Sequence, residues 1–513
     1  MALAWIVSAL ALHAATALAH PLARAATEPD PDNFVNVSLA GKTYTNKESL
    51  SPSVVFPTRS DLLPPTGSSC VWPDPSNFTE STGDTLGGIG SGVALKRGSF
   101  IQQSDGTFTG TIVVQPDRGF NVDGTIDYQA RHHNIDFVLS PYYGDDDLDF
   151  DDALETLQLT YRDTLLYTER NNQKTTGLDA TGVRPAALVG QVMDPPLPIA
   201  PSNSHLTIDA EGLVINSDGT FWTSDEYGPY IYLMSAEGSL LMAIEPPNAI
   251  LPMVNGQIDF TSVDDPDTGR SGNQGFEGLT ADPTGNTLYA MLQSATMQDG
   301  GGDKDTERYT RLLAWDVSSP LSGPPPLIGE WVVPLPLSSK GKTFPQSEIH
   351  FVSEDVFLVL SRDGDGHGGD DNNSAYKQAD LFDISGATDI HGTKFDDPSN
   401  PVAPNGKLDK SVTPAQYVGF VSFIDDDQLA RFGLHNGKPA DQTLIDAKWE
   451  SLALAPCNDP SFPDDYFLFT VADNDYITTD GSMLGQPYDA GLDNDNQFMV
   501  FRVTLPGATV NIA

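Results

Sequence analysis

Glutamate residues that open short apolar runs recur along the chain. The sequence Glu-Gly-Leu at Glu211 returns at Glu277, and looser copies begin at Glu348 and Glu450. Each copy is followed by a similar succession of short apolar runs, and the spacing varies because the turns carry insertions. An earlier copy begins near Gly90 and has serine where the others have glutamate. Carboxylates brought together by a repeat can serve as metal ligands or as acid–base groups.

The stretch 208–244 shows which elements position these glutamates. It contains four short runs of apolar, β-branched and aromatic residues separated by turn-forming pairs, which predicts a four-stranded antiparallel meander. Because strand two returns to the edge where strand one began, the turn after strand two lies beside the residue that opens strand one. Glu211 is therefore expected to share an edge with Asp225, Glu226 and Tyr227.

Repetition of this unit predicts the fold class. Five recognisable units, and one uncertain unit between residues 130 and 201, favour an all-β fold, a β-propeller of six four-stranded blades. The 46 glycines and 39 prolines agree with many short strands and turns. After the last apolar run, 498–504, only nine residues remain. We therefore expect a strand from the N-terminal segment 34–56 to complete the final blade and close the ring.

The same edge argument, applied to every unit, places the opening glutamates and several acidic loops on one face. Carboxylates crowded around one axis repel one another unless a cation lies among them, and Ca²⁺ is the hard cation that takes several oxygen ligands. The sequence therefore predicts a calcium site, with the following candidate ligands: Glu211, Glu277, Glu348, Glu450, Asp473 and Asp475.

Basic side chains lie beside these acids in the sequence. They are either salt-bridge partners or ligands for the anionic oxygens of a phosphate ester, to which arginine offers a bidentate contact. A metal ion combined with arginines forms a workable site for phosphoryl transfer. The candidate substrate-binding residues are Arg118, Arg270, Arg362, Lys448 and, at the rim, Tyr227.

The charge of the chain limits its partners. Twenty-seven basic and 71 acidic residues give a formal net charge of −44, so the summed field repels nucleic acid and anionic membrane surfaces. We expect a monomer whose partner is a small anionic substrate.

The N-terminus predicts export. The first 19 residues are apolar, carry no charged side chain and end in Ala17-Leu18-Ala19, which is typical of a secretory signal cleaved after Ala19. We therefore expect a secreted, extracellular protein with a signal peptide over 1–19, a tail and strap over 20–84 and a propeller over 85–513. Three sequons and the only two cysteines, which we expect to form a disulfide, agree with export: Asn36, Asn77 and Asn372; Cys70 and Cys457.

Five segments carry a family resemblance in this order: DAEGLVINSDGTFWTSDEYGPYIY, NQGFEGLTADPTGNTLYAMLQS, FLVLSRD, KWESLAL and ADND. They resemble the phytase-like family of secreted propeller proteins, which is described as having esterase-like activity of phytase. The resemblance runs from about Gly87 to Pro506. It implies a calcium-dependent phosphoesterase, with these candidate catalytic residues: Glu211, Asp225, Glu226, Glu277 and Glu450, together with Asp473 and Asp475.

Two other functions stay open from the sequence. One is a propeller lactonase or other esterase in which a central Ca²⁺ polarises a carbonyl group. The other is a non-catalytic binding module stabilised by calcium. The sequence contains neither the G-x-S-x-G motif of serine hydrolases nor the H-E-x-x-H motif of zinc proteases, so those two chemistries are not expected.

Overall fold

The structure is a computed structural model that describes residues 34–51, 79–120, 124–144, 146–190 and 192–510. The expected signal peptide, Cys70 and Asn77 lie outside these residues. Strands account for 42% of the structure and helix for 5%, so the prediction of an all-β fold is confirmed. The α-helices in the described part are α1 (Phe150–Ala153) and α2 (Asp426–Ala430). No helix there is long and apolar enough to cross a membrane.

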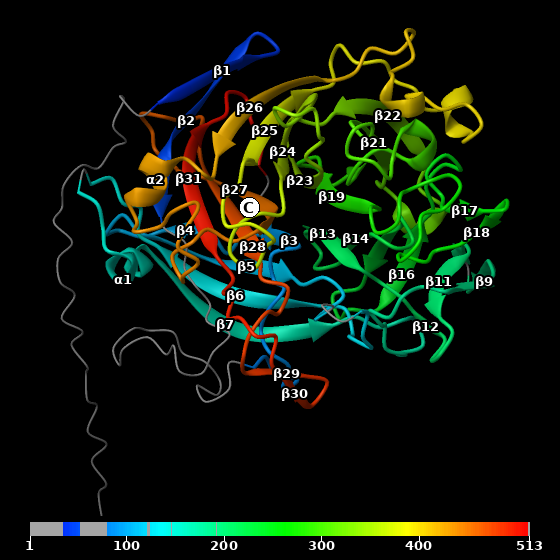
Figure 1. Cartoon of the computed structure of the whole chain (residues 1–513), viewed down its shortest axis with the longest axis horizontal. Coiled ribbons are helices and arrows are strands. Elements are labelled where there is room, and N and C mark those ends of the chain that lie inside the picture. The colour runs from blue at the N-terminus through cyan, green and yellow to red at the C-terminus, as the bar shows by residue number, and fades with distance from the viewer. Residues whose placement is uncertain (1–33, 52–78, 121–123, 145, 191, 511–513) are drawn as a thin grey trace, which may run out of the picture.

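Five antiparallel sheets dominate the chain, and in four of them the strands follow one another in sequence order from the inside outward (Figure 1). The first contains β3 (Gly92–Leu95), β5 (Phe108–Gln115), β6 (Arg131–Leu139) and β7 (Leu157–Leu166), with β4 (Ile101–Gln102) paired to β5. The second contains β13 (Ala210–Ile215), β14 (Phe221–Asp225), β15 (Ile231–Met234) and β16 (Leu240–Ile244). The third contains β19 (Phe276–Ala281), β20 (Thr287–Leu292), β21 (Tyr309–Asp316) and β22 (Leu327–Pro334). The fourth contains β23 (Gln346–Ser353), β24 (Val356–Arg362), β25 (Lys377–Asp383) and β26 (Gln416–Ser422).

The fifth sheet joins the two ends of the chain. Its order is β27 (Lys448–Pro456), β28 (Asp465–Asp473), β31 (Phe498–Thr504), β2 (Lys42–Ser51) and β1 (Val35–Leu39). Strand β2 pairs antiparallel with β31, from Thr45 opposite Thr504 to Ser51 opposite Val500. The prediction that an N-terminal strand completes the last sheet is therefore confirmed.

The first strands of the five sheets form a closed cycle of neighbours. Strand β3 contacts β13, β13 contacts β19, β19 contacts β23, β23 contacts β27, and β27 contacts β3 again. They belong to separate sheets and are not hydrogen-bonded to one another as barrel strands would be. Figure 1 shows these strands gathered around the middle of the molecule, with the other strands of each sheet farther out.

An apolar core lies between each pair of neighbouring sheets. Alternate residues of one strand point to opposite faces, so each sheet contributes to two cores. In β20, for example, Leu288 and Ala290 pack toward the second sheet, whereas Met291 packs toward the fourth. Trp222, Trp315 and Trp449 are buried in these cores, as expected for packing residues. Five such cores hold the cycle together, because each sheet buries both faces.

The prediction of a sixth blade is wrong for the described part of the chain. The apolar runs between residues 130 and 201 do not build a four-stranded sheet of their own in the described part of the chain. Two of them become β6 and β7, the third and fourth strands of the first sheet. The rest form small sheets: β8 (Gly182–Arg184), β11 (Leu197–Ala200) and β12 (His205–Leu206), and separately β9 (Ala187–Val189) and β10 (Val192–Asp194). Two other short hairpins are β17 (Met253–Val254) with β18 (Gln257–Ile258), and β29 (Gly481–Met483) with β30 (Gln486–Tyr488).

Candidate functional site

A β-bulge marks the glutamate that opens three of the first strands. The pairing register shifts between Ala210 and Leu213, which brackets Glu211, and the two other shifts skip Glu277 and Glu450 in the same way. A bulge leaves one residue out of the ladder and turns its side chain away from the ordinary alternation. These three glutamates are therefore directed by the backbone toward the same place.

That place is a cavity of about 260 Å³ in which every lining residue is polar or charged. Its lining consists of Ser91, Asp117, Arg118, Asp209, Glu211, Glu226, Asn273, Glu277, Gln293, Arg362, Lys448, Glu450 and Asp475. The structure thus brings together most of the site residues expected from the sequence. Asp473 lies directly beside the cavity, with its Oδ2 atom 3.3 Å from Ser91 Oγ, which donates to it.

Two groups of three carboxylates lie around this cavity. We call Asp209, Glu211 and Glu226 the first trio, and Asp117, Asp473 and Asp475 the second trio. Within each trio, one carboxylate oxygen from every member lies within 4.8 Å of the others. That spacing suits a cation held by several oxygens.

The first trio is buried and its charges are poorly compensated. Burial raises the pKa of both Glu211 and Glu226 well above the ordinary value, and the neighbouring Glu277 raises both further. Glu226 Oε1 is buried and has no hydrogen-bond partner among the described residues. The backbone N–H of Arg118 donates to Asp209 Oδ1 at 3.1 Å, and Arg118 Nη1 lies 3.1 Å from Asp209 Oδ2. A cation would relieve the repulsion that remains.

The second trio has a lysine among its oxygens. Lys448 Nζ lies 2.7 Å from Asp475 Oδ1 and 3.4 Å from Asp473 Oδ2. Burial, followed by the charge of Asp473, raises the pKa of Asp117 well above its ordinary value. Burial also raises the pKa of Asp473 to about 7, although Lys448 lowers it.

Glu277 also lines the cavity, with one oxygen held and the other open. Gln293 Nε2 donates to Glu277 Oε1, while Oε2 is buried without a partner in the described structure. Burial and then the charge of Glu450 raise the pKa of Glu277 to about 8, and Arg362 opposes the shift. A carboxyl group with such a pKa can exchange a proton near neutral pH.

Two guanidinium groups flank the cavity. Arg362 Nη2 forms an ion pair with Glu450, and Arg118 Nη1 donates to Tyr227 Oη at 3.0 Å and to Asn273 Oδ1. The Nε atoms of both arginines are buried without a hydrogen-bond partner among the described residues. Each arginine thus keeps one donor that an anion could use.

Besides Asp473, four predicted site residues lie outside the cavity lining, and three of them support its walls. Asp225 is fully buried and accepts from the backbone N–H of Asp209 and of Tyr227, each at 3.0 Å, so it holds the loop that presents Glu226. Arg270 is also fully buried and donates to the backbone carbonyl oxygens of Tyr227 and Phe260. Tyr227 donates its hydroxyl to Gly177 O at 3.2 Å and accepts from Arg118.

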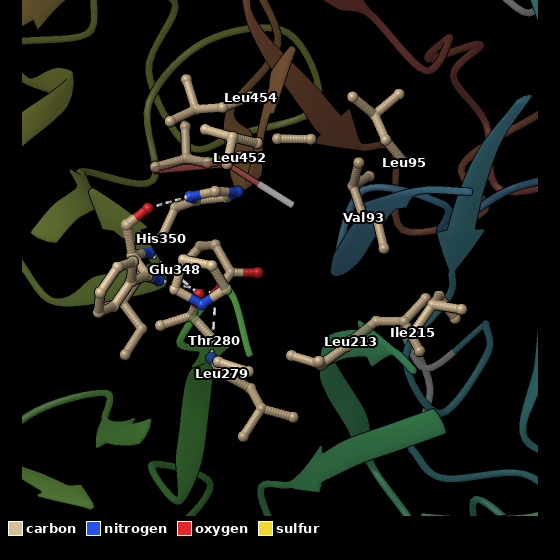
Figure 2. Close-up of a pocket in the computed structure, with 18 of the residues that line it drawn as sticks. Val93, Leu95, Leu213, Ile215, Leu279, Thr280, Glu348, His350, Leu452 and Leu454 are labelled. Atoms are coloured by element: carbon tan, nitrogen blue, oxygen red, sulfur yellow. Dashed lines mark hydrogen bonds between the residues drawn. The ribbon is translucent and has the colours of Figure 1, made fainter. Parts of the chain in front are cut away.

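Glu348 is the fourth, and its predicted place is wrong. The bulge of β23 falls at Ser347, between Gln346 and Glu348, so the serine occupies the position that glutamate holds in the neighbouring sheets. A shift of one residue sends a side chain to a different place. Glu348 lines a second, largely apolar cavity farther along the first strands, where its Oε1 accepts from Leu279 N at 3.0 Å (Figure 2).

Four lining residues were not expected from the sequence: Ser91 as a contributor, Asp209, Asn273 and Gln293. Asp209 immediately precedes β13, the strand that carries Glu211. Gln293 follows β20 and Asn273 precedes β19. The sequence signal that could have identified these residues is their position: they are polar and lie just outside the strands of the repeated unit.

The predicted disulfide is not seen. Cys457 is a buried free cysteine, and Cys70 lies outside the described residues. Of the sequons, Asn36 is exposed on β1 and Asn372 is partly buried in a loop, while Asn77 is outside the described part.

Comparisons with known proteins agree with the motifs. A family model called phytase-like, described as esterase-like activity of phytase, matches residues 85–424. An uncharacterized secreted protein of Arthroderma benhamiae is 38% identical over 453 residues, which cover 80% of this chain and 86% of that protein.

Solved structures are far more distant. A luciferin-regenerating enzyme is 11% identical, with a TM-score of 0.28 over 83% of this chain and 94% of that one. A putative 6-phosphogluconolactonase of Bacteroides uniformis is 12% identical, with a TM-score of 0.26 over 91% of this chain and 98% of that one. On the family match and the sequence relative, which each span well over half of the chain, the protein belongs to the phytase-like family.

Proposed function

We propose that the protein is a secreted, calcium-dependent hydrolase of phosphate esters, in which the five sheets are the blades of a propeller. The observation that carries the proposal is the make-up of one cavity. A carboxylate trio with an orphaned buried oxygen shares the cavity with two arginines that each have a free Nε donor among the described residues. Such a cavity suits a cation and a small anion together.

The first trio fits calcium. Its donors are all carboxylate oxygens, which is the ligand type that Ca²⁺ prefers, and Glu226 Oε1 has no other partner in the described structure. Asp209, Glu211 and Glu226 would hold the ion. When bound, the ion would supply charge neutralisation and Lewis-acid polarisation of a substrate oxygen.

The wholly polar lining favours a phosphate ester over a carboxylic ester. An esterase or lactonase that accommodates an acyl chain needs apolar contacts, and none of the thirteen lining side chains is apolar. Arg118, Arg362 and Lys448 would orient the phosphate oxygens and compensate the charge that develops during reaction.

Glu277 is the candidate general base. Gln293 fixes one of its oxygens and leaves Oε2 unpartnered, and its pKa of about 8 suits a proton acceptor near neutral pH. Water would attack phosphorus while Glu277 takes a proton from it, the bond from phosphorus to the ester oxygen would break, and the departing alkoxide would take a proton from solvent to become the alcohol.

Phosphate release from phytate and from an aryl phosphate, measured with calcium and with a chelator, tests this function. We expect release that requires calcium. Glu226→Gln should weaken calcium binding at least tenfold. Glu277→Gln should keep calcium binding and lower kcat by about 10²–10⁴-fold, the range of general-base catalysis. No phosphate release at any calcium concentration would contradict the proposal, and hydrolysis of an aryl acetate or a lactone instead would select the esterase alternative.

A further inference from the structure

The two carboxylate trios of the cavity differ in what neutralises them. In the first trio, Arg118 forms an ion pair with Asp209 alone, Glu226 Oε1 is buried without a partner, and no basic side chain forms an ion pair with Glu211 or Glu226 in the described structure. In the second trio, an ammonium group already lies within contact of two members. Two sites of similar geometry are thus in different states of charge compensation.

Lys448 is fixed in this position by the fold. It is the first residue of β27 and lies directly opposite Asp473 on β28 in the antiparallel register. Residues directly opposite on paired strands lie close enough for their side chains to interact. The lysine therefore reaches the second trio from the strand that also carries Glu450, whose Oε1 lies 3.6 Å from Lys448 Nζ.

The second trio is held in place independently of the lysine. Asp475 N donates to Asp473 Oδ1 at 2.7 Å, and Ser91 donates to Asp473 Oδ2. Asp475 has a φ of 51°, a left-handed conformation that aspartate tolerates better than most residues. This local structure keeps the carboxylates together whether their counter-charge is an ammonium or a metal ion.

We propose that the Lys448 ammonium takes the place of a second divalent cation, so that the cavity binds one calcium ion, at the first trio. An ammonium group is a compact charge with three donors, and it occupies the space where an ion bound by Asp473 and Asp475 would lie. A cation placed beside it would be repelled. The inference rests on the proposed calcium site and specifies its stoichiometry.

The site would then contain two positive charges of different kinds: an exchangeable calcium ion at the first trio and the permanent ammonium group of Lys448 at the second. Removing calcium would leave the second trio with its ammonium group and the first trio with the Arg118–Asp209 ion pair alone. Removing the lysine would leave Asp117, Asp473 and Asp475 without an ammonium group, beside Glu450, which Arg362 still pairs.

Calcium counting in metal-free protein tests this assignment. Bound calcium would be measured by equilibrium dialysis with elemental analysis in 0.15 M salt, which screens the weak binding expected of so acidic a surface. We expect one tightly bound ion in the wild type and two in Lys448→Met. The double variant Lys448→Met/Asp475→Asn should return to one. Arg118→Met, which removes the positive charge paired with Asp209 of the first trio, should stay at one.

Asp475→Asn alone keeps the test decisive if Lys448→Met does not fold. Asparagine tolerates the left-handed conformation, and the variant should still bind one ion. Two ions in the wild type, loss of an ion in Asp475→Asn, or one ion in folded Lys448→Met would each overturn the assignment of Lys448. No ion in the wild type but one in Lys448→Met would refute the proposed calcium site while supporting the role of the lysine.

Discussion

Three of the five first strands, β13, β19 and β27, present a carboxylate at one end and a leucine at the other. Glu211, Glu277 and Glu450 line the polar cavity. Two residues farther along the same strands, Leu213, Leu279 and Leu452 line the second cavity, with Val93 and Leu95 from β3. Figure 2 shows these apolar side chains converging from different strands. We call the two places the acidic end and the apolar end.

The two ends treat a buried carboxylate differently. At the apolar end, Glu348 accepts hydrogen bonds from two backbone N–H groups, those of Leu279 at 3.0 Å and of Ile349 at 2.7 Å. At the acidic end, Glu226 and Glu277 each keep a buried oxygen without a partner among the described residues. A buried polar group is costly unless it is paired, so the first arrangement is structural and the second leaves room for a ligand.

The same substitution, glutamate to glutamine, should therefore affect phosphate release strongly at the acidic end and hardly at all at the apolar end. Glu277→Gln should lower phosphate release at least 100-fold, because the amide cannot accept a proton. Glu348→Gln should leave release within twofold, because its carbonyl oxygen can still accept both backbone hydrogen bonds. Burial also raises the pKa of Glu348 well above its ordinary value, so a neutral side chain suits its surroundings.

Initial rates of phosphate release under saturating calcium should be compared for Glu277→Gln, Glu348→Gln and the wild type. Melting temperatures would confirm that both variants fold. Equal losses of activity in the two variants would show that Glu348 belongs to the reaction and that the separation of the two ends is not functional.

Much of the fold was predictable because the signal repeats. The opening glutamates and turn pairs gave the four-stranded units, and the short remainder after 498–504 predicted the pairing of β2 with β31. The sixth blade failed because an apolar run does not reveal which sheet it joins. Strands β6 and β7 complete the first sheet across long connections that contain α1.

The sequence predicted which strands supply the site, but not the register that decides which side chain of each strand reaches it. Glu211, Glu277 and Glu450 line one cavity, as expected. Glu348 was expected to join them, but the bulge of β23 falls at Ser347, and Glu348 lies elsewhere. A bulge changes the register by one residue without any mark in composition. Arg270 was expected to bind substrate, but its guanidinium instead binds backbone carbonyl oxygens, a contact that sequence cannot show.

At the apolar end, the largest effect should come from a lost leucine. Leu452 is 1% exposed and packs in the core between the fourth and fifth sheets. Leu452→Ala should lower the free energy of unfolding by about 2–5 kcal/mol, the usual cost of such a truncation, without altering calcium stoichiometry. Denaturant unfolding and calcium counting measure the two effects. A changed stoichiometry would indicate that the two ends are coupled.

The smallest effect should come from His350, which lines the apolar end beside Glu348 (Figure 2). Its Nδ1–H donates to Phe351 O at 2.9 Å, and burial lowers its pKa from the ordinary value of 6.5 to about 4. Because the unfolded chain binds a proton more readily, this residue contributes stability that is complete above pH 6.5 and is lost as pH falls toward 4. The loss between pH 7 and pH 5 is about 2 kcal/mol.

His350→Gln should remove that part of the acid sensitivity, since glutamine can donate to the same carbonyl but does not titrate. Unfolding free energies at pH 7 and pH 5, compared with those of His391→Gln, whose imidazole is only partly buried, isolate the effect from general acid denaturation. Calcium should not change the difference, because His350 lies at the end of the strands away from the carboxylate trios. A difference that disappears in the presence of calcium would instead tie the apolar end to the metal site.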